Sequence, residues 1–195
     1  MSHLIRPVRA EEWREAREIR LAALRDPVAP LAFLDTYEAA VARDDAHWQQ
    51  RTARGAEGRD VRQFVAVAPD GVWLGTVTVL VERRGADVPF GEAAVVDQTH
   101  VVAVYVRPEA RGSRVARDLF RAAVEWSWAL REPFVRRVRL YVHERNVRAA
   151  AFYRKAGFEP SGRAVPMEGD SGGLELEYEV LRRSGCARDE DPPVG

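Results

Sequence analysis

The sequence predicts a single α/β domain in which a mixed central sheet is flanked by helices. Three observations predict it: apolar stripes at helical spacing, alternating apolar residues at strand spacing, and one strand-helix-strand unit over residues 99–143. The element order is β-α-α-β-β-β-α-β-α-β-β. A chain of 195 residues suits one domain, since domains commonly hold about 100–200 residues. We expect the domain to span residues 1–182 and a disordered C-terminal tail to follow over residues 183–195.

The first residues predict a short strand and a helix. The strand covers about residues 3–7. Residues 8–25 carry an apolar stripe with helical spacing, and the helix should end before Asp26, which precedes a proline.

A second helix follows a proline-containing loop at residues 27–34. Residues 35–54 predict one continuous helix. Asp35 or Thr36 can cap its N-terminus, and Glu38 adds favourable negative charge to the first turn.

A β-hairpin is predicted over residues 63–82. Its arms are rich in β-branched and aromatic residues, and Pro-Asp-Gly at residues 69–71 supplies the turn. After a stretch rich in glycine and proline at residues 85–91, residues 99–106 predict a strand that stops at Arg107 because Pro108 follows.

The strand-helix-strand unit contains the clearest helix of the chain, residues 114–130. Residues 137–143 alternate apolar with charged or polar side chains and predict a half-buried strand. Because a helical crossover joins parallel strands, this strand should lie parallel to residues 99–106 and next to them.

The last elements are a short helix and a strand. Asn146 can cap a helix that runs through Lys155, and Gly157 is placed to end it. Residues 174–180 alternate leucine, tyrosine and valine with glutamate, which predicts a strand with one acidic face. Such a face is usually solvated, although it could attract a cationic ligand.

Composition excludes several classes of protein. The chain has 30 basic and 30 acidic residues, and this neutral total argues against a nucleic-acid partner. No stretch approaches the roughly 18 apolar residues of a membrane span, and the start lacks the apolar region of a signal peptide. The single cysteine, Cys186, stands far from any metal-ligand spacing. We therefore expect a soluble cytoplasmic protein without a metal, a membrane partner or a nucleic-acid partner.

Basic residues concentrate in one segment. Residues 107–155 hold 13 basic and 5 acidic residues. Within it, Gly112 permits a sharp turn before the helix at residues 114–130, whose first backbone amides have no intrahelical partner. Free amides at a helix N-terminus bind anions, so this turn predicts a phosphate or pyrophosphate site. The alternative is an arginine-rich cap on a solvated face.

Two motifs resemble the GCN5-related N-acetyltransferase (GNAT) superfamily. VYVRPEARGSRVARDLF at residues 104–120 is similar to the strand and [RQ]xxGx[GA] loop that holds the pyrophosphate of acetyl-CoA. LYVHERNVRAAAFYRKAGF at residues 140–158 is similar to the family's second strand and its aromatic helix. Arg114 departs from the usual glycine; it could crowd the pyrophosphate or pair with a phosphate. The resemblance covers about residues 4–180 and implies the GNAT fold, a mixed central sheet with splayed parallel strands.

The resemblance implies acetyl-CoA as co-substrate and names the residues that would bind it. They are the end of the first parallel strand, the loop and helix start that follow, and the cap of the later helix: Val104, Tyr105, Val106, Arg111, Gly112, Ser113, Arg114, Val115, Ala116, Arg117 and Asn146.

The resemblance also assigns Tyr153 as the general acid that protonates the leaving thiolate, against the alternative of a buried aromatic packing residue. The base that deprotonates the acceptor amine is less specific. Glu92, Asp97 and His100 are candidates because they lie before or at the beginning of the cofactor strand. A satisfied histidine is the alternative for His100.

Three residues near the second predicted helix would face the acceptor by family geometry: Phe33, Tyr37 and Glu38. Ordinary helix packing is their alternative. The resulting hypothesis is an N-acetyltransferase (EC 2.3.1 type) acting on a small-molecule or amino-acid-like primary amine. A non-catalytic acyl-CoA-binding module and a protein lysine or N-terminal acetyltransferase are the competing hypotheses. Trp126 or Trp128 is a candidate contact in a homodimer.

Overall fold

The computed structural model describes residues 2–167 and 173–182 of the chain. The tail predicted over residues 183–195, which includes Cys186, lies outside the described residues.

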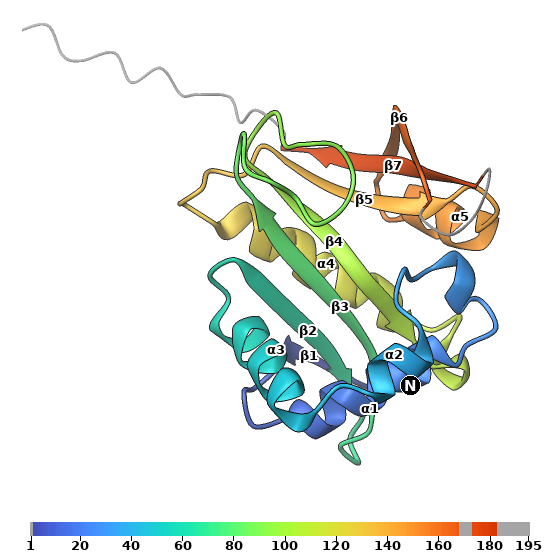
Figure 1. Cartoon of the computed structure of the whole chain (residues 1–195). Coiled ribbons are helices and arrows are strands. Elements are labelled where there is room, and N and C mark those ends of the chain that lie inside the picture. The colour runs from blue at the N-terminus through green and yellow to red at the C-terminus, as the bar shows by residue number, and fades with distance from the viewer. Residues whose placement is uncertain (1, 168–172, 183–195) are drawn as a thin grey trace, which may run out of the picture.

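The described strands form one mixed sheet in the order β1-β2-β3-β4-β5-β7-β6 (Figure 1). All neighbours pair antiparallel except β4 and β5, which are parallel as the crossover predicts. The strands are β1 (Leu4–Pro7), β2 (Val61–Val67), β3 (Trp73–Glu82), β4 (Gln98–Val106), β5 (Arg137–His143), β6 (Glu159–Pro166) and β7 (Leu174–Leu181). The helices are α1 (Trp13–Leu24), α2 (Tyr37–Val41), α3 (Asp45–Glu57), α4 (Val115–Ala129) and α5 (Val147–Lys155).

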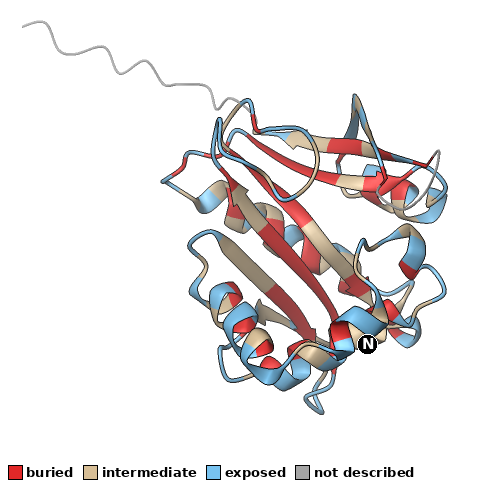
Figure 2. Ribbon diagram, viewed as in Figure 1, coloured by how far each residue is buried: buried red, intermediate tan, exposed pale blue. Residues whose placement is uncertain are grey.

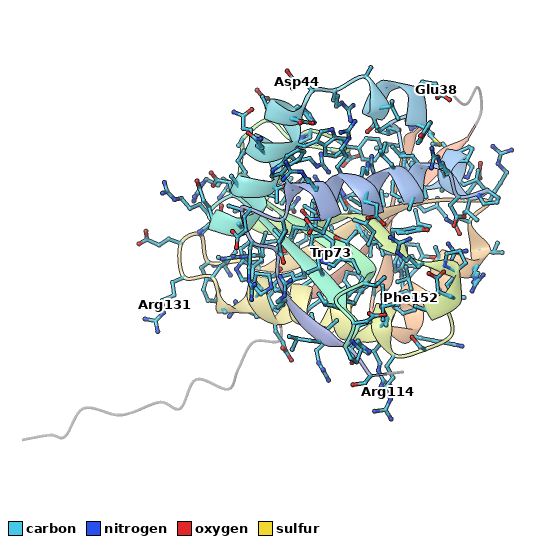
Figure 3. All side chains as sticks on the ribbon, turned by 90° about the horizontal axis from the view of Figure 1, so that it is seen from below. Glu38, Asp44, Trp73, Arg114, Arg131 and Phe152 are labelled. Carbon is cyan, nitrogen blue, oxygen red and sulfur yellow. The ribbon has the colours of Figure 1, made fainter. Side chains whose placement is uncertain are left out.

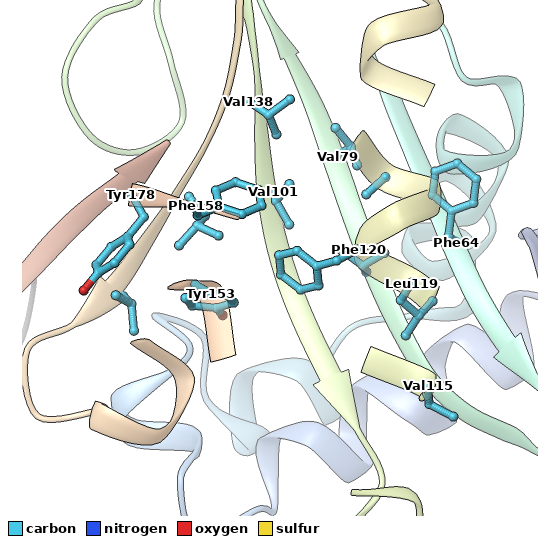
Figure 4. Close-up of a cluster of buried hydrophobic side chains, with 14 of the residues drawn as sticks. Phe64, Val79, Val101, Val115, Leu119, Phe120, Val138, Tyr153, Phe158 and Tyr178 are labelled. Carbon is cyan, nitrogen blue, oxygen red and sulfur yellow. The ribbon is translucent and has the colours of Figure 1, made fainter. Parts of the chain in front are cut away.

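Helices cover both faces of the sheet. On one face, α4 and α5 pack on a core that includes Phe120, Leu140 and Phe158 (Figure 4). On the other face, α1 packs on a smaller cluster that includes Ile19 and Val65. The N-terminal helices therefore lie across the sheet from α4 and α5, and β4 runs between the two groups (Figure 1).

The single helix predicted at residues 35–54 is wrong, because the chain forms α2 and α3 there. Asp44 interrupts the helix: its side chain accepts a hydrogen bond from the His47 amide at 2.8 Å and caps α3. Thr36 caps α2 by accepting from the Ala39 amide at 3.2 Å. The hydrogen bond from the backbone to the Asp44 side chain therefore starts a second helix within residues 35–54, in place of one continuous helix.

The half-buried strand and the solvated acidic face predicted for β5 and β7 are also wrong. Arg139 is 0% exposed and Glu177 is 1% exposed, and β5 is buried along most of its length (Figure 2). Arg139 pairs with Glu177 at 3.0 Å and with Glu82 of β3 at 2.8 Å, and Arg137 pairs with Glu177 at 3.1 Å. The charged faces of three strands neutralise each other, which is how buried charges are tolerated.

The loop between β3 and β4 covers this charged face. The ring of Phe90 contacts the ring of Tyr141 edge to face at 5.1 Å. The hydroxyl of Tyr141 accepts a hydrogen bond from the Glu92 amide at 3.3 Å and donates one to Glu177 at 2.9 Å. The stretch rich in glycine and proline therefore shields the ionic network from solvent.

Candidate active site

The two parallel strands separate after a short stretch of pairing. Residues 98–100 of β4 pair with residues 137–139 of β5, and beyond them β4 pairs with β3 alone. The register between β3 and β4 shifts between Thr76 and Thr78, and Ala103 opposite the shift has a φ of 51°. The extra residue in β4 is a β-bulge, a feature that redirects a strand and leaves backbone groups unpaired. The splay implied by the resemblance is therefore present, with a bulge at its opening.

A cavity of about 280 Å³ occupies the splay. Two valines line the cavity from the face that carries α4 and α5. Val101 is part of the core on that face, and Val104 packs against it. His100 and Tyr141 on its wall alternate with core residues and so face the opposite side of the sheet. The cavity therefore brings together side chains from both faces of the sheet.

Tyr153 of α5 and Glu175 of β7 line this cavity and are 9% and 7% exposed. Burial raises the pKa of the Glu175 carboxyl to about 7. Burial, and to a lesser extent the charge of Glu175, raises the pKa of the Tyr153 hydroxyl. Among the described residues, neither side-chain oxygen group has a hydrogen-bond partner. The two residues offer a protonated hydroxyl and a titratable carboxyl to a molecule in the cavity.

His100 lines the same cavity and is oriented by Glu82. Nδ1 of His100 lies 3.0 Å from Oε1 of Glu82, and Gln98 donates to the other carboxylate oxygen at 2.6 Å. Burial lowers the pKa of His100, against the opposing charge of Glu82. A neutral ring whose Nδ1 donates to a carboxylate keeps its lone pair on Nε2.

The predicted anion-binding turn precedes α4. Gly112 has a φ of 79°, a conformation that favours glycine, with open space around it. The first α-helical hydrogen bond runs from the Asp118 amide to the Arg114 carbonyl at 2.9 Å, so the amides of Ala116 and Arg117 precede it and remain available. The side chain of Arg114 extends away from the molecule (Figure 3), and Arg117 is likewise exposed. Free amides and two exposed cations suit a phosphate group.

The family-model comparison decides the classification. Residues 13–158 match the model described as "Acetyltransferase (GNAT) family", which is most of the chain. The chain belongs to the GNAT acetyltransferase family. Membership of this family supports an N-acetyltransferase activity, as the two motifs predict.

Solved GNAT structures share the fold at low sequence identity. A GNAT-family acetyltransferase from Streptococcus pneumoniae is 17% identical, with a TM-score of 0.71 and coverage of 93% of this chain and 100% of that one. Arabidopsis thaliana NAA60, solved with acetyl-CoA, is 17% identical with a TM-score of 0.65, covering 92% and 98%. A spermidine N-acetyltransferase chimera from Vibrio cholerae SpeG and hSSAT is 14% identical with a TM-score of 0.63, covering 93% and 96%. No protein of curated function matched the sequence.

In this GNAT fold, two of the residues predicted to bind the cofactor line the cavity. Val104 lines the cavity and Asn146 both lines it and caps α5, accepting from the Ala149 amide at 3.2 Å. Val106 is partly buried against the core.

Other predicted cofactor residues serve the structure with their side chains. Arg111 donates to the Val106 carbonyl at 3.0 Å and to Asp26, which ties the turn to the segment after α1. Ser113 donates to the Ala110 carbonyl at 2.6 Å. Side chains of Val115 and Tyr105 are buried. Only backbone atoms of such buried residues are available to a ligand.

The structure separates the predicted acceptor residues. Phe33 lines the cavity. Tyr37 instead binds Arg25 through its hydroxyl, and Glu38 is exposed at the surface (Figure 3). Glu92 pairs with Arg163 at 2.8 Å outside the cavity lining. Of the catalytic candidates, Tyr153 and His100 therefore share the cavity and Glu92 does not.

Several residues of the cavity lining were not predicted as site residues, among them Glu175 on β7, Arg20 on α1 and Arg51 on α3. Glu175 belongs to the acidic alternation that the sequence analysis interpreted as a surface face. The position of Arg20 on the apolar stripe of α1 is the one sequence signal that it points inward. Nothing local distinguishes Arg51 from the other arginines of α3.

Within residues 2–167 and 173–182, no group of three or more potential ligand side chains is arranged to hold a metal ion. The same described residues include no helix that is both long and apolar enough to cross a bilayer.

Proposed function

We propose that this protein transfers the acetyl group of acetyl-CoA to the primary amine of a small molecule by direct attack on the thioester. The observation that carries the proposal is the cavity between the splayed strands β4 and β5. Tyr153 and the carboxyl of Glu175, which has no hydrogen-bond partner among the described residues, both line it. At about 280 Å³ it lies near the lower end of ligand pockets, which span about 300–1,000 Å³. A small acceptor fits that volume better than a protein segment does.

The turn before α4 supports the binding of acetyl-CoA in this proposal. The amides of Ala116 and Arg117 and the charges of Arg114 and Arg117 suit the pyrophosphate of CoA. The unpaired edge of β4 beyond residues 98–100 offers backbone groups to the amide-containing pantetheine arm. Acetyl-CoA and CoA occur in solved relatives, which supports the same co-substrate here.

Tyr153 would act on the departing sulfur. Its pKa is raised above the usual value of about 10, so the hydroxyl remains protonated and donates a hydrogen bond to the developing thiolate. A thiol of ordinary pKa, about 8.5, is the stronger acid. Tyr153 therefore stabilises the thiolate by hydrogen bonding more than by complete proton transfer.

Glu175 and His100 are the candidates for the proton that the amine loses. A carboxyl with a pKa of about 7 suits a general base near neutral pH, where the efficiency of proton transfer is greatest. Glu175 also lines the same cavity as Tyr153, and its charge contributes to the raised pKa of that hydroxyl, which supports a position near the reacting thioester. His100 has a neutral ring but is engaged with Glu82. We therefore assign the base to Glu175 and keep His100 as the alternative.

The reaction balances within these groups. The neutral amine forms the new C–N bond, the C–S bond breaks, and the electron pair leaves on the sulfur of CoA. The proton lost by the amine passes to the carboxylate of Glu175 and then to solvent or to the thiolate. The carboxylate is regenerated for the next turnover.

A calorimetric titration and an amine screen test this function together. Acetyl-CoA should bind and stabilise the protein, unlike unrelated nucleotides, and amines should then cause thiol release. Binding without thiol release from any small amine or peptide would favour a non-catalytic acyl-CoA-binding module. Release with peptides alone would favour a protein acetyltransferase. No binding of acetyl-CoA would refute the proposal.

A further inference from the structure

The cavity has a basic wall opposite the side that holds Tyr153 and Glu175. Arg20 of α1 and Arg51 of α3 both line it, and these helices lie on the other side of β4 from α5 and β7 (Figure 1). Arg20 stacks over the ring of Phe33, with its guanidinium carbon 4.6 Å from the ring centroid. The guanidinium of Arg20 is therefore held at the cavity wall by an aromatic ring, while Arg51 reaches the wall from an exposed position on α3.

These arginines are incompletely neutralised by protein groups. Asp35 is engaged by Arg43 through two hydrogen bonds of 2.7 and 2.8 Å, and Arg20 reaches it only at 3.3 Å. Nε of Arg20 is buried without a hydrogen-bond partner. Within the described chain, the guanidinium of Arg51 makes neither a hydrogen bond nor an ion pair. Arg20 and Arg43 thus share the Asp35 carboxylate, and Arg51 has no carboxylate within hydrogen-bond distance among the described residues.

A small recess lies next to the two arginines. It has a volume of about 20 Å³. Its polar lining comprises Arg20, Arg51, Gln63, Thr76 and Thr78, and its other side is formed by Ala16, Ile19, Ala23, Ala103 and Tyr105. Such a space is large enough for one or two polar atoms. The Gln63 amide donates to the Thr76 hydroxyl at 3.0 Å, and that hydroxyl donates to the Phe64 carbonyl at 3.0 Å. The two guanidinium groups are therefore the donors that suit a planar oxyanion, which guanidinium groups bind through paired hydrogen bonds.

We propose that the acceptor amine also carries a carboxylate, which Arg20 and Arg51 bind while the amine lies toward Glu175. This inference rests on the proposed function and narrows its acceptor to amino carboxylates. A polycation such as a polyamine would be repelled by the arginine wall, since like charges in a shared cavity are unfavourable.

Matched acceptor pairs test the inference. Amino acids with different spacings between amine and carboxylate are compared with their carboxamides, which keep the shape but lose the charge, at saturating acetyl-CoA. We expect acids to have kcat/KM values at least about 10-fold above those of their amides, because hydrogen bonds to charged groups are the stronger ones.

Variants then attribute the preference to the arginines. Arg51→Gln, at an exposed position, should abolish the preference for acids, and Arg51→Lys should keep part of it. Arg54→Gln on the same helix, at an exposed residue outside the cavity lining, is the matched control and should keep it fully. Acetyl-CoA affinity should be equal in all four proteins.

A binding measurement separates this inference from the proposed function. N-acetyl amino acids and their amides are titrated into the CoA-loaded protein, which requires no turnover. Tighter binding of the acids that is lost in Arg51→Gln supports the inference even if no acceptor is turned over. Equal binding of acids and amides, a preference unchanged by Arg51→Gln, or weakened acetyl-CoA binding in that variant would overturn it, even if amines are acetylated.

Discussion

The carboxyl of Glu175 on β7 acts electrostatically on the hydroxyl of Tyr153 on α5, and both line the cavity between the splayed strands. Ionisation of the carboxyl makes the loss of the tyrosine proton more difficult, because two negative charges would then lie close together. In the proposed mechanism, Tyr153 therefore stays a hydrogen-bond donor while the ionised Glu175 accepts a proton.

Removing the Tyr153 hydroxyl should lower turnover without weakening cofactor binding. Tyr153→Phe keeps the ring, which packs against Phe120 at a centroid distance of 5.4 Å (Figure 4). We expect kcat to fall by about 100-fold, the scale of positioned proton donors, with acetyl-CoA affinity nearly unchanged. Thiol-release kinetics and calorimetry measure the two quantities. Tyr178→Phe, at another buried tyrosine, is the control, and an unaltered rate in Tyr153→Phe would remove the residue from the chemistry.

The pH profile should identify the base. The carboxylate of Glu175 accepts a proton only when ionised, so kcat/KM should rise with pH through about 7. Glu175→Gln should lower kcat/KM about 100-fold, and the rise of kcat/KM with pH near 7 should disappear. His100, Tyr153 and the acceptor amine also titrate in or near this cavity, so His100→Gln is measured in parallel. A limb that survives in Glu175→Gln but disappears in His100→Gln would transfer the role to His100.

Glu175 should also make folding stability depend on pH. Burial raises its pKa to about 7 in the folded protein, against 4.5 for an ordinary glutamate carboxyl. Between these values the folded state binds a proton that the unfolded state releases, so stability falls as pH rises through this window. Glu175→Gln should therefore gain about 1–3 kcal/mol relative to the natural protein between pH 5 and pH 8, after solvent screening. Urea unfolding at both pH values measures it, with exposed Glu159→Gln as control. Parallel pH dependences in all three proteins would contradict the pKa shift.

The exposed charge at the cofactor turn should contribute salt-dependent affinity. Arg114→Ala should weaken acetyl-CoA binding about 3- to 10-fold at low salt, and less at high salt, because exposed charges are screened. Arg131→Ala removes the same charge from an exposed residue well away from Arg114 (Figure 3) and should have little effect. Unchanged or tighter binding in Arg114→Ala would mean that the side chain only crowds the turn.

The buried ionic network should be important for stability. Arg139→Met leaves Glu82 and Glu177 without their shared cation, and breaking a buried pair costs about 3–5 kcal/mol. Urea unfolding should show this loss, and a double variant with Glu177→Gln should lose less than the sum of the single losses. Arg121→Gln, at an exposed arginine that pairs with Asp118 at 3.4 Å, should change stability by under about 1 kcal/mol. Additive losses would argue against a coupled network.

Elements with a local signal were predictable, and those that depend on distant partners were not. The α1 stripe, the hairpin, the crossover unit and the Asn146 cap all appear as predicted, because periodicity and capping act between residues close in sequence. The Asp44 cap within residues 35–54 was missed because the same side chain also suits a helix surface. The range of β6 was missed because proline, glycine and arginine interrupt its strand pattern.

The sequence by itself determined the GNAT family, the parallel crossover and the glycine turn before α4, since each is encoded in contiguous residues. Only the tertiary structure decided which charges are buried. It paired Arg139 with Glu82 and Glu177, left Glu175 beside Tyr153, and brought Arg20 and Arg51 to one cavity wall. Whether a charged side chain faces water, a partner or a ligand depends on strands and helices that are distant in sequence. Local patterning signalled the inward position of Arg20 alone among these side chains.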